Sequence, residues 1–410
     1  MSEASPNRNR ANARVIGIIS ALIASTFIWY FYAFSILTSI LDNARWTSYE
    51  VLGAWVANFG GAALSAILGA LLVDKSQKKS SFLIFWIMLG IVSSFLPVFV
   101  DTTNITGALT LSLLFGVSLG LGLPSCMGFF SERVGVEDRA KVGGMIVLAF
   151  GLGAFFLGMI PASNVGERSF ILSACRVVGL LIFLLMRNVE RGDKSGQGVS
   201  YVQVLTQRSF LLYFVPWCMF CLINYSMFPI TANVFGEEFV RFSAVIEGAL
   251  IGIFAIAGGF LADIFGRKRL SILGFVALGV GYAILGVFSG NLFGWYFYIT
   301  VDGVAWGIFY NLFLITLWGD LAFGNRSEKY YAIGGLPFLL SNFLRFIVGP
   351  FLVEAIPIYT VFSLASFFLF LSVVPLMYAP ETLPEKRMKE RELKSYVEKA
   401  KEVSEKYIRK

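Results

Sequence analysis

Twelve apolar stretches, each about 20 residues long, divide this 410-residue chain and limit its fold more than any other feature. A helix of that length crosses the hydrocarbon core of a bilayer, which is roughly 30 Å thick. The strands of a membrane barrel would instead alternate in polarity over about ten residues. The sequence therefore predicts an all-α membrane protein, because helices satisfy their own backbone hydrogen bonds inside lipid. The expected membrane helices are 15–41, 48–73, 81–100, 106–130, 143–162, 169–187, 209–231, 243–263, 270–289, 294–318, 331–353 and 357–379.

The composition excludes an ordinary soluble domain, since 57% of the residues are hydrophobic and only 14% are charged. The net charge of +7 needs no nucleic-acid partner, because basic residues beside membrane helices also interact with anionic lipid headgroups. The sequence contains no histidine, so we expect neither a metal site nor a cofactor. We also expect no enzymatic activity, because no phosphate-binding loop and no nucleophile with a recognisable base occurs.

A short motif occurs twice, at equivalent places in the two halves of the chain. The first copy consists of Gly69, Leu72, Asp74, Lys78 and Lys79, and the second of Gly258, Leu261, Asp263, Arg267 and Lys268. In both copies an apolar stretch ends at the aspartate, a basic turn follows, and another apolar stretch begins. The spacing within the two copies is identical, which indicates an internal duplication.

The distribution of Lys and Arg predicts the orientation, because short cytoplasmic loops retain positive charge during insertion. Of the 33 basic residues, Arg45, Arg168 and Arg241 alone fall between spans on the side opposite the motifs, while Arg176 and Arg345 fall within spans. An even number of spans places both termini and both motif turns on the side that carries the remainder. We therefore expect a multi-pass protein of the cell membrane with both termini in the cytoplasm.

The longest polar segment between two spans divides the chain into six helices and six. It is rich in glycine and charge and is expected to be a flexible linker. The expected organisation is a cytoplasmic N-terminal segment 1–14, an N-terminal bundle 15–187, the linker 188–208, a C-terminal bundle 209–379 and a charged helical tail 380–410 in the cytoplasm.

The second copy of the motif carries a family resemblance. The stretch from Gly258 to Arg269 is similar to the signature loop of the major facilitator superfamily, which follows helix 2 and helix 8 in that family. The first copy departs from the pattern, with Gln77 where a glycine is usual. The Pro-Glu-Thr sequence at 380–382 resembles the end of helix 12 in sugar porters and several organic-ion transporters.

The resemblance implies the major facilitator fold, with twelve helices in two pseudo-symmetric six-helix bundles, and a secondary transporter that works by alternating access. It also implies that the two motif turns form a gate on the cytoplasmic side. The gate residues would be Asp74, Lys78, Lys79, Asp263, Gly266, Arg267 and Lys268. Each aspartate can pair with its basic turn or with the positive N-terminus of helix 5 or helix 11. The alternative is that these charges only set the topology.

Ionisable side chains within the spans point to mechanism, since a charge in hydrocarbon is costly unless it is paired or hydrated. Asp302 and Arg345 are expected at equal depth on helices 10 and 11, as an ion pair that is either static or exchanged during transport. Asp302 and Glu247 are the candidate proton-coupling residues, although Glu247 is equally explained as a hydrated carboxylate near the outer surface. Arg345 and Arg176 are the candidate charge partners, and Arg176 is also explained by snorkelling.

Helices 1, 4, 7 and 10 line the cavity in this family, and three of them carry polar or aromatic groups near mid-span here. The candidate cavity residues are Tyr30, Asn224, Tyr225, Tyr310 and Asn311. Each of them is also explained by packing or by hydrogen bonding between helices. So few hydrogen-bonding groups suit a small organic acid or an amphiphile at least as well as a sugar.

The expected function is secondary active transport of a small organic solute, such as an organic acid, a sugar or a related metabolite, coupled to protons. The expected partners are this solute, protons and membrane lipid. One chain is expected to work as a monomer, because it contains both halves of an alternating-access machine. Two alternatives stay open, namely an efflux antiporter for drugs or amphiphiles and a non-transporting sensor on a transporter scaffold.

Overall fold

The computed structural model describes residues 6–44, 46–76, 79–162, 164–185, 197–288, 290–352 and 358–383. Side chains are given for these residues except 6–13, 75–76, 228–241, 342, 345, 347–352 and 358. Every regular element in the described ranges is a helix, which confirms the expected all-α fold. The charged tail that was expected to be helical lies outside the described residues from position 384 onward.

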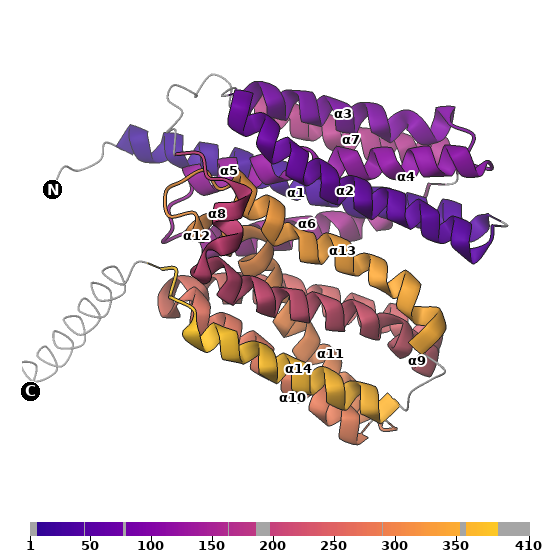
Figure 1. Cartoon of the computed structure of the whole chain (residues 1–410). Helices are drawn as coiled ribbons and strands as arrows, with labels where there is room; N and C mark the ends of the chain where they lie inside the picture. The colour runs from indigo at the N-terminus through magenta and orange to yellow at the C-terminus, as the bar shows by residue number, and fades with distance from the viewer. Residues whose placement is uncertain are drawn as a thin grey trace, which may run out of the picture.

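The first half of the chain forms the helices in the upper part of Figure 1. They are α1 (Pro6–Asn43), α2 (Ser48–Ser76), α3 (Lys79–Phe99), α4 (Ile105–Gly120), α5 (Leu123–Arg133), α6 (Arg139–Gly158) and α7 (Val165–Leu184). Asn104 and Asn164 mark the starts of α4 and α7, because each side chain accepts a hydrogen bond from a backbone N–H in the first turn.

A short helix in the linker, α8 (Tyr201–Thr206), leads to the second half of the chain. The elements of that half are α9 (Arg208–Phe265), α10 (Arg267–Phe288), α11 (Leu292–Phe309), the π-helix η1 (Tyr310–Thr316), α12 (Leu317–Leu321), α13 (Glu328–Leu352) and α14 (Ile358–Tyr378). They form the lower part of Figure 1, except that α13 lies against α2 between the two halves.

The element α9 is a hairpin of two membrane spans. A straight helix of its 58 residues would be roughly 87 Å long at 1.5 Å per residue. Its two ends nevertheless meet adjacent residues, since Tyr213 Oη donates to Pro380 O at 2.8 Å and the Arg267 N–H, just after α9, donates to Glu381 at 2.8 Å. The chain therefore reverses direction between the two apolar arms Arg208–Met227 and Phe242–Phe265.

Two expected spans are not continuous α-helices. The span expected at 106–130 breaks between α4 and α5, where Pro124 lacks the N–H that would continue the hydrogen-bond ladder. At this break Gly122 lies against Trp86 so closely that a Cβ at position 122 would be 2.1 Å from the indole ring. The span expected at 294–318 contains the seven-residue π-helix η1, and such wide turns are often found at functional sites.

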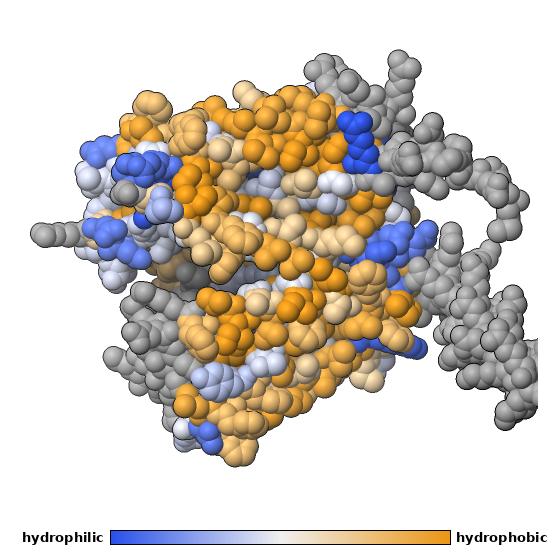
Figure 2. Space-filling view, turned by 180° about the vertical axis from the view of Figure 1, so that it is seen from behind, coloured by the Kyte–Doolittle hydropathy of each residue, from blue (hydrophilic) through white to orange (hydrophobic). Residues whose placement is uncertain are grey.

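The outer surface is that of a multi-pass membrane protein. Ten segments of the described chain are long and apolar enough to cross a membrane. The two other expected spans correspond to α7 and α13, and α7 carries the charged residues Glu167, Arg168 and Arg176. Figure 2 shows apolar residues over the flank of the molecule and hydrophilic residues gathered at its two ends.

Candidate functional site

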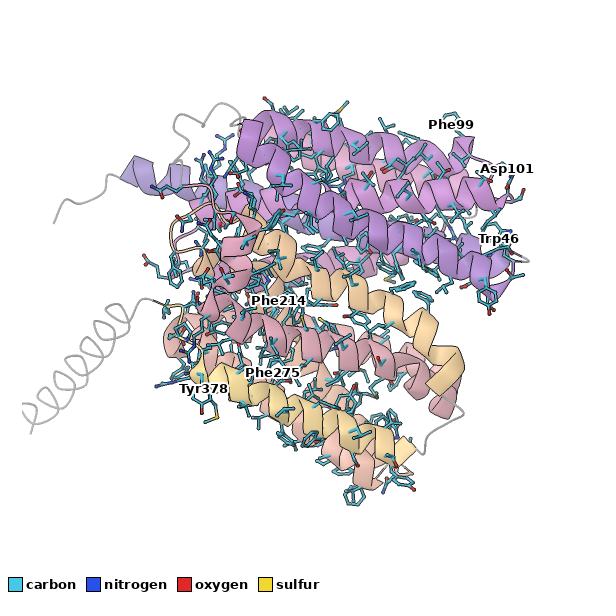
Figure 3. All side chains as sticks on the ribbon, viewed as in Figure 1. Trp46, Phe99, Asp101, Phe214, Phe275 and Tyr378 are labelled. Carbon is cyan, nitrogen blue, oxygen red and sulfur yellow. The ribbon has the colours of Figure 1, made fainter. Side chains whose placement is uncertain are left out.

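Both copies of the motif lie at one end of the bundle, which we call the motif end. Trp46, Phe99 and Asp101 mark the opposite end, whereas Tyr378 lies toward the motif end (Figure 3). The ionisable groups of the motif end and a carboxyl pair within the second half are the two polar clusters that bear on function.

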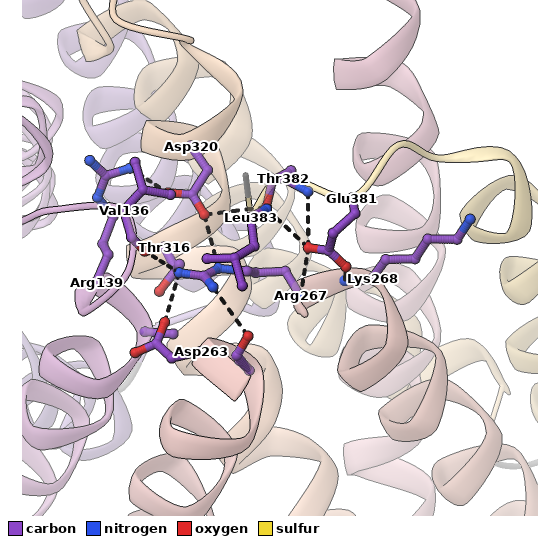
Figure 4. A network of polar contacts seen from close by, with 12 residues as sticks. Val136, Arg139, Asp263, Arg267, Lys268, Thr316, Asp320, Glu381, Thr382 and Leu383 are labelled. Carbon is purple, nitrogen blue, oxygen red and sulfur yellow. Dashed lines mark hydrogen bonds and ion pairs between the residues drawn. The ribbon is translucent and has the colours of Figure 1, made fainter. Parts of the chain in front are cut away.

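The second copy of the motif belongs to a buried ion network centred on Asp320 (Figure 4). Asp320 accepts hydrogen bonds from Arg139 Nη1 and, at 3.1 Å, from Arg267 Nε. None of these three side chains is more than 5% exposed. Because Arg139 begins α6 and the other two residues belong to the second half, the network joins the two halves of the molecule.

Asp263 extends this network to the N-terminus of α6. Its Oδ2 accepts a hydrogen bond from the backbone N–H of Lys141 at 2.8 Å, and its Oδ1 lies 2.7 Å from Arg267 Nη2. Lys141 is in the first turn of α6, so the carboxylate interacts with the positive end of that helix. The sequence analysis offered two partners for this aspartate, its own basic turn and the N-terminus of a neighbouring helix, and Asp263 contacts both.

Gly266 and Glu381 join the end of α9 to the start of α10. Gly266 has a φ of +100°, and a Cβ at this position would lie 2.3 Å from Glu381 Oε2, so only glycine fits. Glu381 accepts the backbone N–H groups of Arg267 and Lys268 at 2.8 and 3.1 Å, which otherwise have no partner at a helix start. The Pro-Glu-Thr sequence thus caps α10, and Lys268 Nζ donates to Met377 O at 2.7 Å.

The first copy of the motif contacts the start of α13. Asp74 lies 3.0 Å from Arg326 and 2.7 Å from Lys329. The linker covers this pair, because Lys329 Nζ also donates to Val199 O and Tyr201 Oη donates to Ile67 O at 2.6 Å. Burial of the Tyr201 hydroxyl, with the Asp74 carboxylate nearby, raises the pKa of Tyr201 well above its usual value.

Lys79 forms a second bridge between the halves. Its ammonium group pairs with Glu132 of the first half and lies 2.5 Å from Glu328 of the second half. Lys78, the remaining gate candidate, lies outside the described residues. The sequence did not identify the side chains that pair with Asp74 and Lys79, because they are far away in the chain; Lys329, for example, is 255 positions from Asp74.

Helices α6 and α9 touch backbone to backbone beside this network. A Cβ at Gly144 would lie 2.3 Å from Ala255 O. Asn311 of η1 spans the same contact, since its Nδ2 donates to Ala140 O at 2.8 Å and to Ala255 O at 2.9 Å. The Asn311 side chain is fully buried here and cross-links the two halves, and its place in the cavity stays a prediction.

A carboxyl pair lies within the second half. The carboxyl groups of Asp302 and Glu247 are within hydrogen-bonding reach of one another, and the Tyr298 hydroxyl also contacts Asp302. Tyr298 donates to Tyr282 at 3.1 Å, and Tyr282 donates to Asn224 Oδ1 at 3.4 Å. A polar chain therefore runs from the buried Asp302 to the candidate cavity residue Asn224.

The expected pairing of Asp302 with Arg345 stays a prediction, because the Arg345 side chain lies outside the described side chains. The sequence did not predict the contact between Asp302 and Glu247. The sequence indicated that both carboxylates are unusual, since each lies in an apolar span. It did not show that the second arm of α9 packs on α11 and so brings the two carboxyl groups together.

The tyrosines that were expected in the cavity gather around two aromatic residues of the second half. The ring of Tyr310 lies 4.7 Å from that of Trp306 and 5.8 Å from that of Phe338, between ring centres. Tyr225 lies 6.0 Å from each of the same two rings. Tyr30, of the first half, lines one cavity together with Phe338.

Arg176 is buried inside the first half and does not reach the surface by snorkelling, since it is 1% exposed. Its guanidinium lies between the rings of Trp29 and Trp86, at 4.3 and 4.7 Å from their centres. Its Nη atoms donate to Thr26 Oγ1 at 3.0 Å and to Ser118 O at 3.4 Å. Ser118 is in the last turn of α4, so this cation stabilises the negative end of the broken helix.

Replacing Arg176 by lysine is expected to destabilise the protein more than replacing it by methionine. Lysine keeps a buried charge but loses the planar fork that reaches both Thr26 and Ser118. Methionine removes the charge, and apolar replacement of buried ionic groups is often neutral or stabilising. Thermal unfolding in detergent measures the difference, and a lysine variant as stable as the native protein would contradict this role of Arg176.

The comparisons with known proteins agree on the fold. No protein-family model and no curated protein matches the sequence. The human organic anion transporter MFSD10 (TETRAN) superimposes with a TM-score of 0.67 and 14% identity, over 89% of this chain and 99% of that chain. The proton:xylose symporter XylE gives a TM-score of 0.67 and 14% identity over 90% and 96% of the two chains. The fucose:proton symporter FucP of E. coli gives 0.69 and 12% over 88% and 98%.

The architecture thus defines a class, that of multi-pass membrane proteins built from two helical halves that meet at an ion-paired end. Within that class, the chain has the fold of the major facilitator superfamily, as the duplicated motif and the three solved structures agree. One further structure of similar fold, with a TM-score of 0.67, is FucP in its outward conformation.

Proposed function

We propose that this protein is a secondary active transporter that moves a small organic solute across the cell membrane by alternating access. The observation that carries the proposal is the closed motif end, where buried ion pairs and the Gly144 contact join the two halves. At the opposite end a cavity of about 330 Å³ is lined by α1, α6 and Arg168. All the residues that line this cavity belong to the first half, so it is the closed motif end that matches one state of an alternating-access cycle.

The motif end faces the cytoplasm in this proposal, which makes the present state one that is closed toward the cytoplasm. Support comes from the Lys and Arg count, because the basic residues concentrate on that side. The two working units are then 15–187 and 209–379, joined by a linker at 188–208, and one chain suffices for function. The motif ion pairs act as the gate that must open when the cavity turns inward.

The carboxyl pair of Asp302 and Glu247 is the proposed proton-coupling site. Asp302 is buried, and a buried carboxyl group beside a second one can hold a proton because its ionised form is costly there. Loss or gain of that proton changes the charge that is buried beside Tyr298, and so favours one state of the cycle over the other. Support comes from the polar chain that links the pair to Asn224.

Substituting Asp302 by asparagine is expected to abolish accumulation that is driven by a pH gradient, because the variant cannot release a proton. Exchange of labelled for unlabelled solute across the membrane needs no net proton movement and is expected to persist. Solute uptake into proteoliposomes measures both the accumulation and the exchange, and Glu247→Gln is measured beside Asp302→Asn for comparison. Uptake by Asp302→Asn that still follows the pH gradient would exclude this residue as the coupling site.

The competing function is a non-transporting sensor on the same scaffold. A panel of sugars, organic acids and hydrophobic cations in proteoliposomes separates the two. Movement of any solute under an imposed gradient supports transport, and its direction distinguishes an importer from an efflux antiporter. Binding without movement of any solute would favour the sensor.

A further inference from the structure

The cavity at the end opposite the motif end combines a cation with an apolar wall. It has a volume of about 330 Å³ and lies within the first half, between α1, the end of α6 and the start of α7. Of the described residues that line it, Arg168 alone carries a charge, while Phe31, Ile36 and Leu157 provide apolar surface. An apolar cavity with a few polar groups is typical of a site for a small molecule.

Arg168 reaches the cavity with most of its hydrogen-bonding capacity unused. A guanidinium group has several N–H donors, and Arg168 uses Nη1 to donate to Ser39 Oγ at 3.1 Å. In the part of the chain that the structure describes, no carboxylate pairs with Arg168. The remaining donors of its planar fork are therefore available to a carboxylate or a phosphate, the groups that a guanidinium binds best.

Two hydroxyl groups of α1 add to this binding surface. Tyr32, Ser35 and Ser39 follow one another at intervals of three and four residues, which places them on one face of the helix. Tyr32 and Ser35 line the cavity, and Arg168 is close enough to Tyr32 for its charge to act on the hydroxyl. Neither of these two hydroxyls has a hydrogen-bond partner among the described residues, so both are available to a ligand.

The cavity has room for an organic anion, and not only for an inorganic ion. An apolar cavity of about 150 Å³ holds a benzene ring, and this cavity, at about 330 Å³, has roughly twice that volume. Its apolar wall stabilises a ring or a hydrocarbon chain by removing it from water. The cation and the wall together therefore match a carboxylate or a phosphate that is attached to an apolar group.

We propose that this cavity is a binding site for an organic anion. The carboxylate or phosphate group of the ligand binds Arg168 and the hydroxyls of α1, and its apolar group contacts Phe31 and Leu157. A small organic acid and an anionic lipid both offer this chemistry, and binding measurements with one of each distinguish them. The site is separate from the carboxyl pair of Asp302 and Glu247 and goes beyond the proposed transport function, because binding here needs no transport.

Two pairs of variants test the site independently. Arg168→Gln removes the charge, and Arg208→Gln is its control, because Arg208 is an exposed arginine at the start of α9 and does not line the cavity. Gly158→Leu fills the cavity, since Gly158 lines it and a Cβ at this position would meet no atom within 4 Å. Gly151→Leu is the control on the same helix, because Gly151 is exposed, does not line the cavity and also has no atom within 4 Å of an added Cβ.

Titration calorimetry of the full-length protein in a non-ionic detergent measures the binding of three probes. They are benzoate, benzyl alcohol, which has the same ring without the charge, and dihexanoylphosphatidate, a short-chain anionic lipid. We expect benzoate or the phosphatidate to bind, and benzyl alcohol not to bind. Arg168→Gln and Gly158→Leu are each expected to weaken the binding of the anion by about tenfold, which corresponds to roughly 1.4 kcal/mol, whereas the two controls leave it unchanged.

Binding of benzoate supports the site with a small organic acid as its ligand, and binding of the phosphatidate alone supports it with a lipid. Anion binding that is unchanged in Arg168→Gln or Gly158→Leu, or that benzyl alcohol matches, would overturn the proposal, and so would the absence of binding by both anions. Gly158→Leu decides alone if Arg168→Gln fails to fold. Each of these outcomes leaves the transport proposal standing, because that proposal is tested by the movement of solutes.

Discussion

Replacing Asp320 by alanine is expected to open the motif end, with the largest effect of any single substitution in the gate. The change leaves Arg139 and Arg267 buried, at 5% and 0% side-chain exposure, without the carboxylate that both of them contact. Breaking a buried ionic cluster by removing one partner typically costs about 3–5 kcal/mol. Opening exposes both arginines to water, so the equilibrium shifts toward the state in which the two halves separate at this end.

The reactivity of a cysteine at position 131 measures this shift, since Ser131 is buried at the same interface and its hydroxyl lies 2.6 Å from that of Ser327. In Ser131→Cys with the native cysteines replaced, Asp320→Ala is expected to speed maleimide labelling by about a hundredfold or more, at a tenfold change per 1.4 kcal/mol. Asp74→Ala is the matched control. Its side chain is 25% exposed, against 0% for Asp320, so water reaches this carboxylate and its loss is expected to cost less than the loss of Asp320. Equal labelling rates in Asp320→Ala and Asp74→Ala would contradict the expectation that Asp320 contributes more than Asp74 to closing the motif end.

Replacing Gly144 by leucine is expected to prevent the motif end from closing. Any side chain at this position meets Ala255 O, because even a Cβ would lie 2.3 Å from that backbone atom. A backbone atom cannot rotate away as a side chain does, so α6 and α9 must separate, and the hydrogen bonds of Asn311 across the same contact are lost with them. We expect the protein to fold, to remain open at the motif end and to lose transport.

Gly151→Leu is the control for this substitution. Gly151 lies two turns further along the same helix, is exposed, and has no atom within 4 Å of an added Cβ. Labelling at position 131 and solute exchange are expected to match the native protein in this variant. Native labelling in Gly144→Leu would mean that the α6–α9 contact does not hold the motif end shut.

Much of the fold was predictable because it depends on patterns that are local in the sequence. The lengths of the apolar runs predicted the membrane spans. The equal spacing of the two motif copies, which contain Asp74 and Asp263, predicted that the two halves of the chain are equivalent. The electrostatic preference of a carboxylate for a helix N-terminus also led to the correct class of partner for Asp263. These inferences need no knowledge of which helices pack together.

The parts that the sequence did not predict depend on packing between distant segments. The break after Gly120 is stabilised by Trp86 and by Arg176, which lies 58 positions beyond Ser118. Asn311 was expected in a cavity because its helix lines one, yet the π-helical turn directs its amide into the α6–α9 contact. The contact between Glu247 and Asp302 likewise depends on packing, because the expected spans 209–231 and 243–263 do not show that the second of them packs on α11.

The distance across each end of the molecule tests the central claim, alternating access, most directly. One pair of spin labels at Asp138 and Asn325 spans the motif end, and a second pair at Tyr49 and Tyr359 spans the opposite end; all four positions are exposed. In lipid, we expect two populations in which one pair is short when the other is long, with Asp320→Ala shifting the motif-end pair to the long distance. Two distances that stay fixed, or that lengthen together, would contradict the account.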